Sequence, residues 1–136
     1  MLGQICIVIS AIIIFLLGTL HLTYTFFTDK FHPQDTALLT TLKVATPIIS
    51  RETTIWKGLV GFNASHSIGF IMFGLIYGYL AFAHLDFFVS SAFLMIIGLA
   101  TLLSYMALAK QYWFKVPFTG ITLATAFYIV GLVLSR

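Results

Sequence analysis

The sequence predicts an all-α fold, an integral membrane four-helix bundle in which residues 1–136 form one domain. Composition is the first reason, because 60% of the residues are hydrophobic and only 8% are charged. Soluble domains carry about 25% charged residues. The second reason is the presence of four apolar stretches, each reaching the roughly 20 residues that a helix needs to cross the hydrocarbon core. Helices suit lipid because they satisfy their backbone polar groups internally.

The expected spans follow these stretches in order, approximately residues 4–27, 57–82, 87–109 and 117–135. The first stretch lacks the basic start and the cleavage site of a secretory signal, so we expect a retained helix. The short link Ala83-His84-Leu85-Asp86 predicts that the second and third spans form a tight antiparallel hairpin. Pro117 fits the first turn of the last span, where its missing N–H does no harm.

The long connection over residues 28–56 contains a possible helix of its own. Apolar side chains recur in it at helical spacing, namely Leu38, Leu39, Leu42 and Ala45. This pattern favours a short amphipathic helix that lies at the membrane surface and covers the mouth of the bundle. An ordinary solvated connector fits the same residues.

The basic residues indicate the orientation of the spans. Six of them flank the face that holds the long connection: Lys30, Lys43, Arg51, Lys57, Lys110 and Lys115. Only Arg136 flanks the opposite face. Cytoplasmic loops of membrane proteins carry an excess of Lys and Arg. We therefore expect the long connection in the cytoplasm and both termini on the non-cytoplasmic side.

Polar side chains of the four expected spans fall at similar depth. At about 1.5 Å per helical residue, His21 and Asn63 lie about 9 Å inside the cytoplasmic boundary, and His66 about 13 Å. On the same rise, Tyr105 of the third span and Thr122 of the fourth lie about 8 Å inside. Polar groups at such depth are costly and mark functional sites. The layer therefore predicts a site that is open toward the cytoplasmic leaflet.

The residue types in this layer suggest what the site could do. A neutral histidine in apolar surroundings can act as a general acid or base, so His66 and His21 are candidate catalytic residues. The candidate ligand-binding residues lie in the same layer or at its aromatic rim: Asn63, Tyr105, Trp56 and Thr122. They could orient the carbonyl or hydroxyl group of a membrane lipid or another apolar small molecule. The sequence selects no substrate and leaves open whether the protein is an enzyme.

Each of these residues also fits a purely structural role. A histidine or asparagine in a membrane helix can simply bond to a neighbouring helix, and such bonds contribute about 0.6 kcal/mol on average. Trp56 stands where an aromatic belt is expected. His32 and His84 lie in connections and are expected to be solvated. The tandem small residues Gly61, Ser65 and Gly69, by contrast, let another helix approach closely. They favour the alternative of an accessory subunit in a homo-oligomer or a larger membrane complex.

A metal or haem is a further alternative, and the cofactor remains unknown. His21 and His66, on facing helices, could ligate a haem axially, as bundle cores can build such sites. Zinc usually takes three or four protein ligands, whereas the layer has two histidines and no acid. The chain is also short for a membrane haem protein and has no second histidine pair. Metal or haem binding is therefore not the favoured interpretation.

Several other function classes are disfavoured. Nucleic-acid binding needs a basic patch or stripe, and the seven Lys and Arg residues are too few and too scattered for one. The chain has no nucleophile elbow, phosphate-binding loop or paired carboxylates, so hydrolase and kinase chemistry are not expected. Without intramembrane acids, four short helices also make a poor transporter.

Three segments carry a resemblance to a known group of proteins. They are the run Trp56 to Gly69, with the pattern W-x6-N-x-S-H-S, the run Gly18-Thr19-Leu20-His21-Leu22, and the run Lys110 to Pro117. Together they make the chain similar to an uncharacterised family of small bacterial four-helix membrane proteins. The resemblance implies the four-helix fold, the site around His66 and a place in the bacterial inner membrane. It implies no particular activity.

Overall fold

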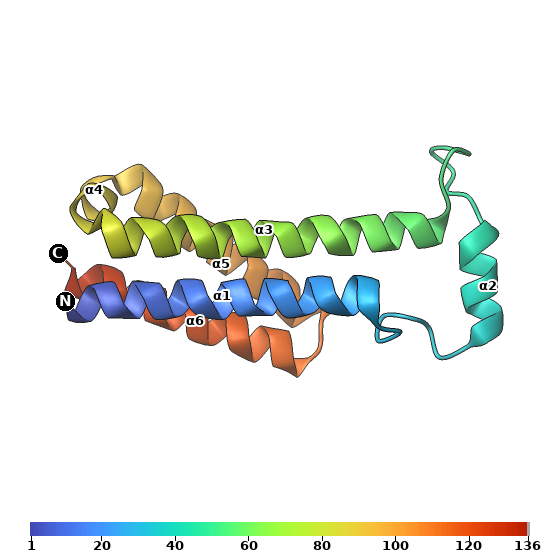
Figure 1. The fold of residues 1–136 in the computed structure, drawn as a ribbon, viewed down its shortest axis with the longest axis horizontal. Helices are drawn as coiled ribbons and strands as arrows, with labels where there is room; N and C mark the ends of the chain where they lie inside the picture. The colour runs from blue at the N-terminus through green and yellow to red at the C-terminus, as the bar shows by residue number, and fades with distance from the viewer. Residues whose placement is uncertain (136) are drawn as a thin grey trace. The chain divides into compact units, whose positions relative to one another are not determined.

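The computed structural model describes residues 1–135 as an all-α chain without strands. Arg136, the basic residue expected on the face of the termini, lies outside the described residues. The helices follow one another as α1 (Leu2–Phe27), α2 (Thr36–Val44), α3 (Ile55–Ala83), α4 (Leu85–Ser90), α5 (Ala92–Tyr112) and α6 (Lys115–Leu134) (Figure 1).

The helices α1, α3, α5 and α6 are long and apolar enough to cross a membrane. They correspond to the four expected spans, and the chain is accordingly a multi-pass membrane protein. Large apolar side chains are exposed along each of them, for example Leu16, Leu75, Ile96 and Val130. Lipid can surround such surfaces without the cost that water would impose.

The hairpin between the second and third spans differs from the prediction. The third span begins at Ala92 instead of residue 87, because the short helix α4 occupies the end of the expected link and the first residues of the expected span. The backbone of Ser91 is extended, with φ −94° and ψ 98°, and its Oγ accepts a hydrogen bond of 3.3 Å from the Leu94 N–H. Ser91 is thus an N-cap, and this cap separates α4 from α5.

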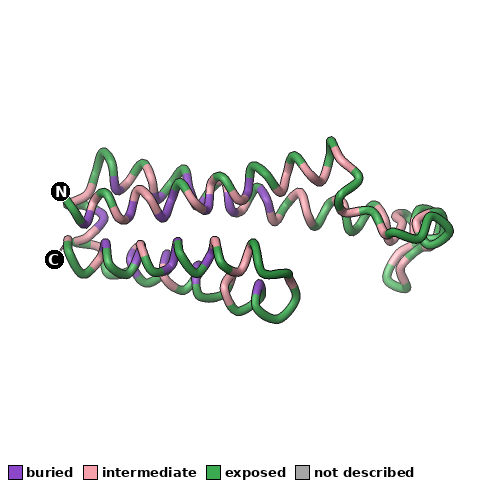
Figure 2. Tube along the Cα trace, turned by 90° about the horizontal axis from the view of Figure 1, so that it is seen from below, coloured by how far each residue is buried: buried purple, intermediate pink, exposed green. Residues whose placement is uncertain are grey.

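The long connection contains the predicted helix, α2. Asp35 begins it as the N-cap, since its Oδ1 accepts hydrogen bonds from the N–H groups of Ala37 at 2.8 Å and Leu38 at 3.3 Å. No residue of α2 is buried (Figure 2). Leu39 and Leu42 are half-buried and the other residues of α2 are exposed. The expected place of α2 at the membrane surface stays a prediction.

The chain divides into two compact units. One, here called the core unit, combines Met1–Leu17 with the chain from Phe70 onward. The other, the loop unit, is the continuous segment Gly18–Gly69. The buried hydrophobic cluster belongs entirely to the core unit, where it runs from Ile7 to Tyr128 in the sequence.

Aromatic rings fill the centre of the core unit. Tyr128 is fully buried, and its ring centroid lies 5.9 Å from that of Tyr77. Both hydroxyls donate to backbone carbonyls of α5, from Tyr77 to Leu94 at 3.1 Å and from Tyr128 to Met95 at 3.2 Å. A Cβ added at Gly98 would meet the Tyr128 hydroxyl and would lie 2.6 Å from Cε1 of Tyr77. A residue without a side chain is therefore required where α5 passes these rings.

The first part of α1 is held closely within the core unit. A Cβ at Gly74 of α3 would lie 2.7 Å from the Ala11 carbonyl oxygen, so the two backbones nearly touch there. The Gln4 side chain donates hydrogen bonds of 3.1 Å to the carbonyl oxygens of both Ala81 and Phe82. These carbonyls belong to the last turn of α3, where carbonyl groups have no donor within the helix. The Gln4 amide provides that donor.

Candidate functional site

The loop unit brings together three of the predicted site residues. His21 comes from α1, while Asn63 and His66 lie one turn apart on α3. The His21 Nε2 atom lies 3.4 Å from Asn63 Oδ1. The ring centroids of His21 and His66 are 5.6 Å apart, with an angle of 74° between the ring planes. All three side chains are half-buried. We call these three residues the histidine pair site.

The roles in the contact between His21 and Asn63 depend on the tautomer of the imidazole. With the ring proton on Nε2, His21 donates to the Asn63 carbonyl oxygen. A neutral imidazole with its proton on Nε2 keeps an acceptor lone pair on Nδ1. The site thus combines donors and acceptors from two imidazoles and an amide.

The hydroxyl groups beside these residues are engaged in their own helices. Thr25 donates to the carbonyl oxygen of His21 at 2.8 Å. The fully buried Ser67 donates to the carbonyl oxygen of Asn63, also at 2.8 Å. Hydroxyls in helices commonly bond back to the preceding turn in this way. The imidazoles and the amide are consequently the polar groups that connect α1 with α3 here.

Aromatic side chains lie against both histidines. The ring of Phe31 is centred 4.6 Å from that of His21. Phe62 lies nearly parallel to His66, with the ring centroids 6.4 Å apart. Sequence reasoning missed Phe31, because the residue lies outside any helical repeat. A turn returns it to α1, and the hydrogen bond from the His32 N–H to the Asp29 carbonyl oxygen, 2.8 Å long, holds that turn.

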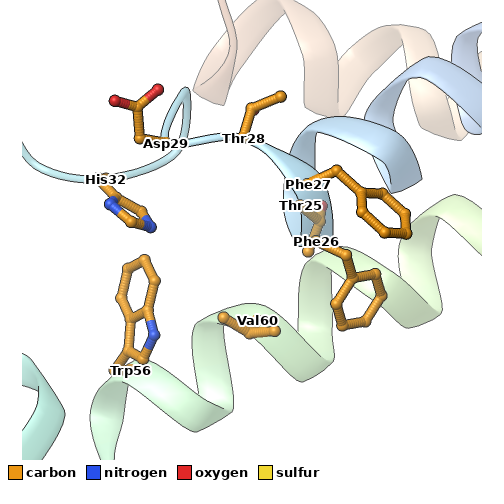
Figure 3. A pocket seen from close by; sticks show the side chains of 8 residues that line it. All are labelled: Thr25, Phe26, Phe27, Thr28, Asp29, His32, Trp56 and Val60. Carbon is orange, nitrogen blue, oxygen red and sulfur yellow. The ribbon is translucent and has the colours of Figure 1, made fainter.

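Trp56 contributes to a different feature of the loop unit, an open pocket of about 690 Å³. Its lining residues come from the end of α1, the turn after it and the start of α3: Thr25, Phe26, Phe27, Thr28, Asp29, His32, Trp56 and Val60 (Figure 3). His32, expected to be solvated, is exposed but also packs edge-on against Trp56, with the ring centroids 5.0 Å apart. Figure 3 shows these two rings facing each other on one side of the pocket.

Tyr105 and Thr122, the other two members of the predicted layer, belong to the core unit. The half-buried Tyr105 stacks on Phe70, with ring centroids 4.2 Å apart. Thr122 is exposed, and its hydroxyl donates to the Phe118 carbonyl oxygen at 2.8 Å. A part for either residue in ligand binding stays a prediction.

His21 and His66 supply two possible ligands for a metal ion. Within residues 1–135, no group of three or more His, Cys, Asp or Glu side chains is placed to hold a metal ion. Zinc sites in proteins use three or four such ligands. His21 and His66 alone therefore do not complete a zinc site of that kind.

The tandem small residues on α3 present an open surface at Gly61. A Cβ added there, or at Gly58, would have no described atom within 4 Å apart from its chain neighbours and the nearby backbone of α3. Ser65, one turn later, is exposed, and its hydroxyl donates to the Phe62 carbonyl oxygen at 2.9 Å. This part of the predicted ridge is therefore not covered within the described chain.

No protein-family model matches the chain, and neither a curated protein nor a solved structure matches it. Function is therefore inferred from the geometry of the described residues, and the family resemblance stays a prediction.

Proposed function

We propose that this multi-pass protein binds a lipid-like or other apolar ligand at the histidine pair site, near the cytoplasmic leaflet of the bacterial inner membrane. The observation that carries the proposal is the convergence of His21, Asn63 and His66, with His21 Nε2 3.4 Å from Asn63 Oδ1 and the two imidazoles 5.6 Å apart. Two imidazoles and an amide meet at one point, although hydrophobic residues make up 60% of the chain.

The cost of polar groups in a membrane supports a binding role. Imidazoles and amides inside a span are expensive, and they are retained where they meet a ligand, an ion or one another. Here the three side chains offer both donors and acceptors, which suits the carbonyl or hydroxyl group of an apolar molecule. The rings of Phe31 and Phe62 lie against the two histidines and suit the apolar part of that molecule.

The site also has the components for proton transfer. With its proton on Nε2, His21 donates to Asn63 and keeps Nδ1 as a proton acceptor. His66 stands beside this second imidazole, with the ring centroids 5.6 Å apart. A neutral imidazole can take up a proton from a bound hydroxyl or deliver one to a carbonyl. His66 and His21 are the proposed acid–base groups, and Tyr105, Trp56 and Thr122 remain proposed ligand contacts.

Mass spectrometry of molecules that copurify with the protein in mild detergent tests the binding proposal. We expect an apolar ligand with the wild type, and about tenfold lower occupancy in His66→Ala, His21→Ala and Asn63→Leu, which corresponds to about 1.4 kcal/mol. His84→Ala is the matched control, because His84 is exposed and bonds Tyr79 at 3.2 Å in the core unit. Equal occupancy in all four variants would refute the proposal. A Soret band or bound metal lost in His66→Ala would support the haem or metal alternative.

A second candidate function, an accessory subunit that packs through small residues, is favoured by the open surface at Gly61. In that case Gly61→Leu should dissociate a homo-oligomer or larger complex while the helical content is unchanged. Native gel electrophoresis of membranes that contain the wild type and the variant measures this directly. A wild type that migrates as a monomer removes this candidate.

A further inference from the structure

The open pocket at the ends of α1 and α3 has a distinctive charge. Asp29 is the one carboxylate among the residues that line it, and no lysine or arginine is among them. Within the described chain, no hydrogen bond or ion pair engages the Asp29 carboxylate. By contrast, the carboxylate of Asp35 accepts two backbone hydrogen bonds. The pocket therefore carries a negative charge that no described side chain neutralises.

The nearest basic residue in the sequence is directed elsewhere. Lys30 follows Asp29, but its Nζ lies 3.9 Å from the centre of the Tyr24 ring. Tyr24 does not line the pocket. Because this ammonium group is held over an aromatic face, Asp29 remains available to a cation from outside the chain.

Four of the other seven lining residues are aromatic, and the rest are Thr25, Thr28 and Val60. Phe27 is 82% exposed and Phe26 is 56% exposed, both in the last turn of α1. Trp56 and His32 add two further rings (Figure 3). Aromatic faces attract organic cations, and apolar rings at the end of a membrane helix also suit a hydrocarbon chain. A volume of about 690 Å³ accommodates such a group, since ligand pockets typically measure about 300–1,000 Å³.

We infer that this pocket binds an organic ammonium group attached to an apolar chain. The Asp29 carboxylate attracts the ammonium, and the rings of His32 and Trp56 stand on the same side of the pocket (Figure 3). The exposed rings of Phe26 and Phe27 offer apolar surface to the chain. Because no lysine or arginine lines the pocket, the phosphate of a lipid headgroup would lie outside it while the ammonium enters. The ammonium group can belong to a lipid headgroup or to a free amphiphilic amine. The inference rests on the pocket and does not depend on the function proposed for the histidine pair site.

Tryptophan fluorescence can test this inference in a neutral maltoside detergent. The only other tryptophan is Trp113, so Trp113→Phe makes Trp56 the sole reporter. In one arm the protein is titrated with phosphatidylethanolamine, with phosphatidylglycerol of the same chains as the control. In the other arm dodecylammonium is compared with dodecanol. We expect a saturable change in Trp56 emission with an amine and none with its uncharged or anionic counterpart.

The two arms identify the source of the ammonium group. Saturation by phosphatidylethanolamine alone identifies a lipid headgroup, and saturation by dodecylammonium alone identifies a free amine. Saturation in both arms supports recognition of the shared ammonium chemistry. No response in either arm, or an equal response to the controls, overturns the inference.

Variants assign the binding to the pocket. Asp29→Asn should weaken amine binding at least about tenfold, and added salt should weaken it in the wild type. Glu52→Gln makes the same chemical change in the same loop, but outside the pocket lining, and should bind like the wild type. His66→Ala should also leave the titration unchanged, which separates this result from the test of the histidine pair site. Equal affinities for Asp29→Asn and the wild type would contradict the assignment, provided that circular dichroism shows both to be folded.

Discussion

Polar side chains in the spanning helices form hydrogen bonds in two different ways, whereas the buried hydroxyl of Ser10 has no partner among the described residues. Short hydroxyl groups bond to the preceding turn of their own helix, as Thr101 does to Ile97 and Ser104 to Ala100, both at 2.8 Å. The amide of Gln4 and the ring of His21 instead reach another helix. A hydroxyl that is satisfied locally says little about function. Imidazoles and amides that bond across helices are the informative residues in a chain of this kind.

A double-mutant cycle on His21 and Asn63 measures this contact. We expect a coupling free energy of about 0.6 kcal/mol between His21→Ala and Asn63→Ala, the average for hydrogen bonds between membrane helices. Unfolding of the two single variants and the double variant in detergent of increasing denaturing strength gives the value. Additive effects would show that the contact contributes nothing, in which case Asn63 does not orient His21.

Close packing at Gly98 leads to a second prediction at this scale. Gly98→Ala should destabilise the protein by about 1–3 kcal/mol, the typical cost of overpacking, because the new methyl group meets the Tyr128 hydroxyl and Tyr77. Gly58→Ala is the control, since its methyl group meets no described atom and alanine favours a helix by up to about 1 kcal/mol. Thermal unfolding followed by circular dichroism compares the two. Equal effects of the two substitutions would argue against the packing described for Gly98.

The helices show how far sequence patterns lead in this protein. The length of each apolar stretch predicts the spans well, because every helix needs the same minimum number of residues to cross the hydrocarbon core. The start of α5 is set locally by the N-cap at Ser91. Hydropathy does not reveal this boundary, because the residues on both sides of it are apolar. The serine ahead of Ala92 was the signal that could have revealed it. The contact of Phe31 with His21 had no such signal, since it depends on the path of a turn.

Two sequence criteria predicted the contacts of the histidine pair site. Helical spacing placed Asn63 and His66 on one face of α3, and similar depth in the membrane paired them with His21, as the structure has them. Depth alone does not determine which side of a helix a residue occupies. Thr122 matched the layer in depth, yet its hydroxyl is engaged within α6.

The cap of α2 can be tested as a property of that element alone. Asp35→Ala removes the acceptor of two backbone N–H groups, and loss of an N-cap costs about 1 kcal/mol. We expect faster amide hydrogen exchange over residues 36–44 and unchanged exchange in the spans. Glu52→Gln, in the same connection, is the control. Unaltered exchange in α2 would mean that the membrane surface, and not the cap, holds this helix.

At the scale of the whole molecule, four spanning helices dictate which connections share a side. If all four cross the membrane, the α1–α3 and α5–α6 connections lie on one side, and the α3–α5 connection lies on the other with both termini. The basic residues cluster on the first side, which we propose is the cytoplasm.

Cysteine labelling in cells tests this orientation. Cys6 is the only native cysteine, so Cys6→Ser provides a clean background. An impermeant maleimide should label Asp86→Cys in cells whose outer membrane has been permeabilised, and should label Glu52→Cys only in inverted vesicles. The reverse pattern would invert the proposed topology. Labelling of both positions from the same side would exclude four spans.

The two units differ in when they can be completed during synthesis. The loop unit is one continuous segment, and all of it has been translated once Gly69 has been added. The core unit joins Met1–Leu17 to the chain from Phe70 onward, so it stays open until α6 has left the ribosome. Gln4 can meet its carbonyl partners only after 77 and 78 further residues have been added. A chain interrupted before α6 would therefore carry a complete loop unit without a finished core.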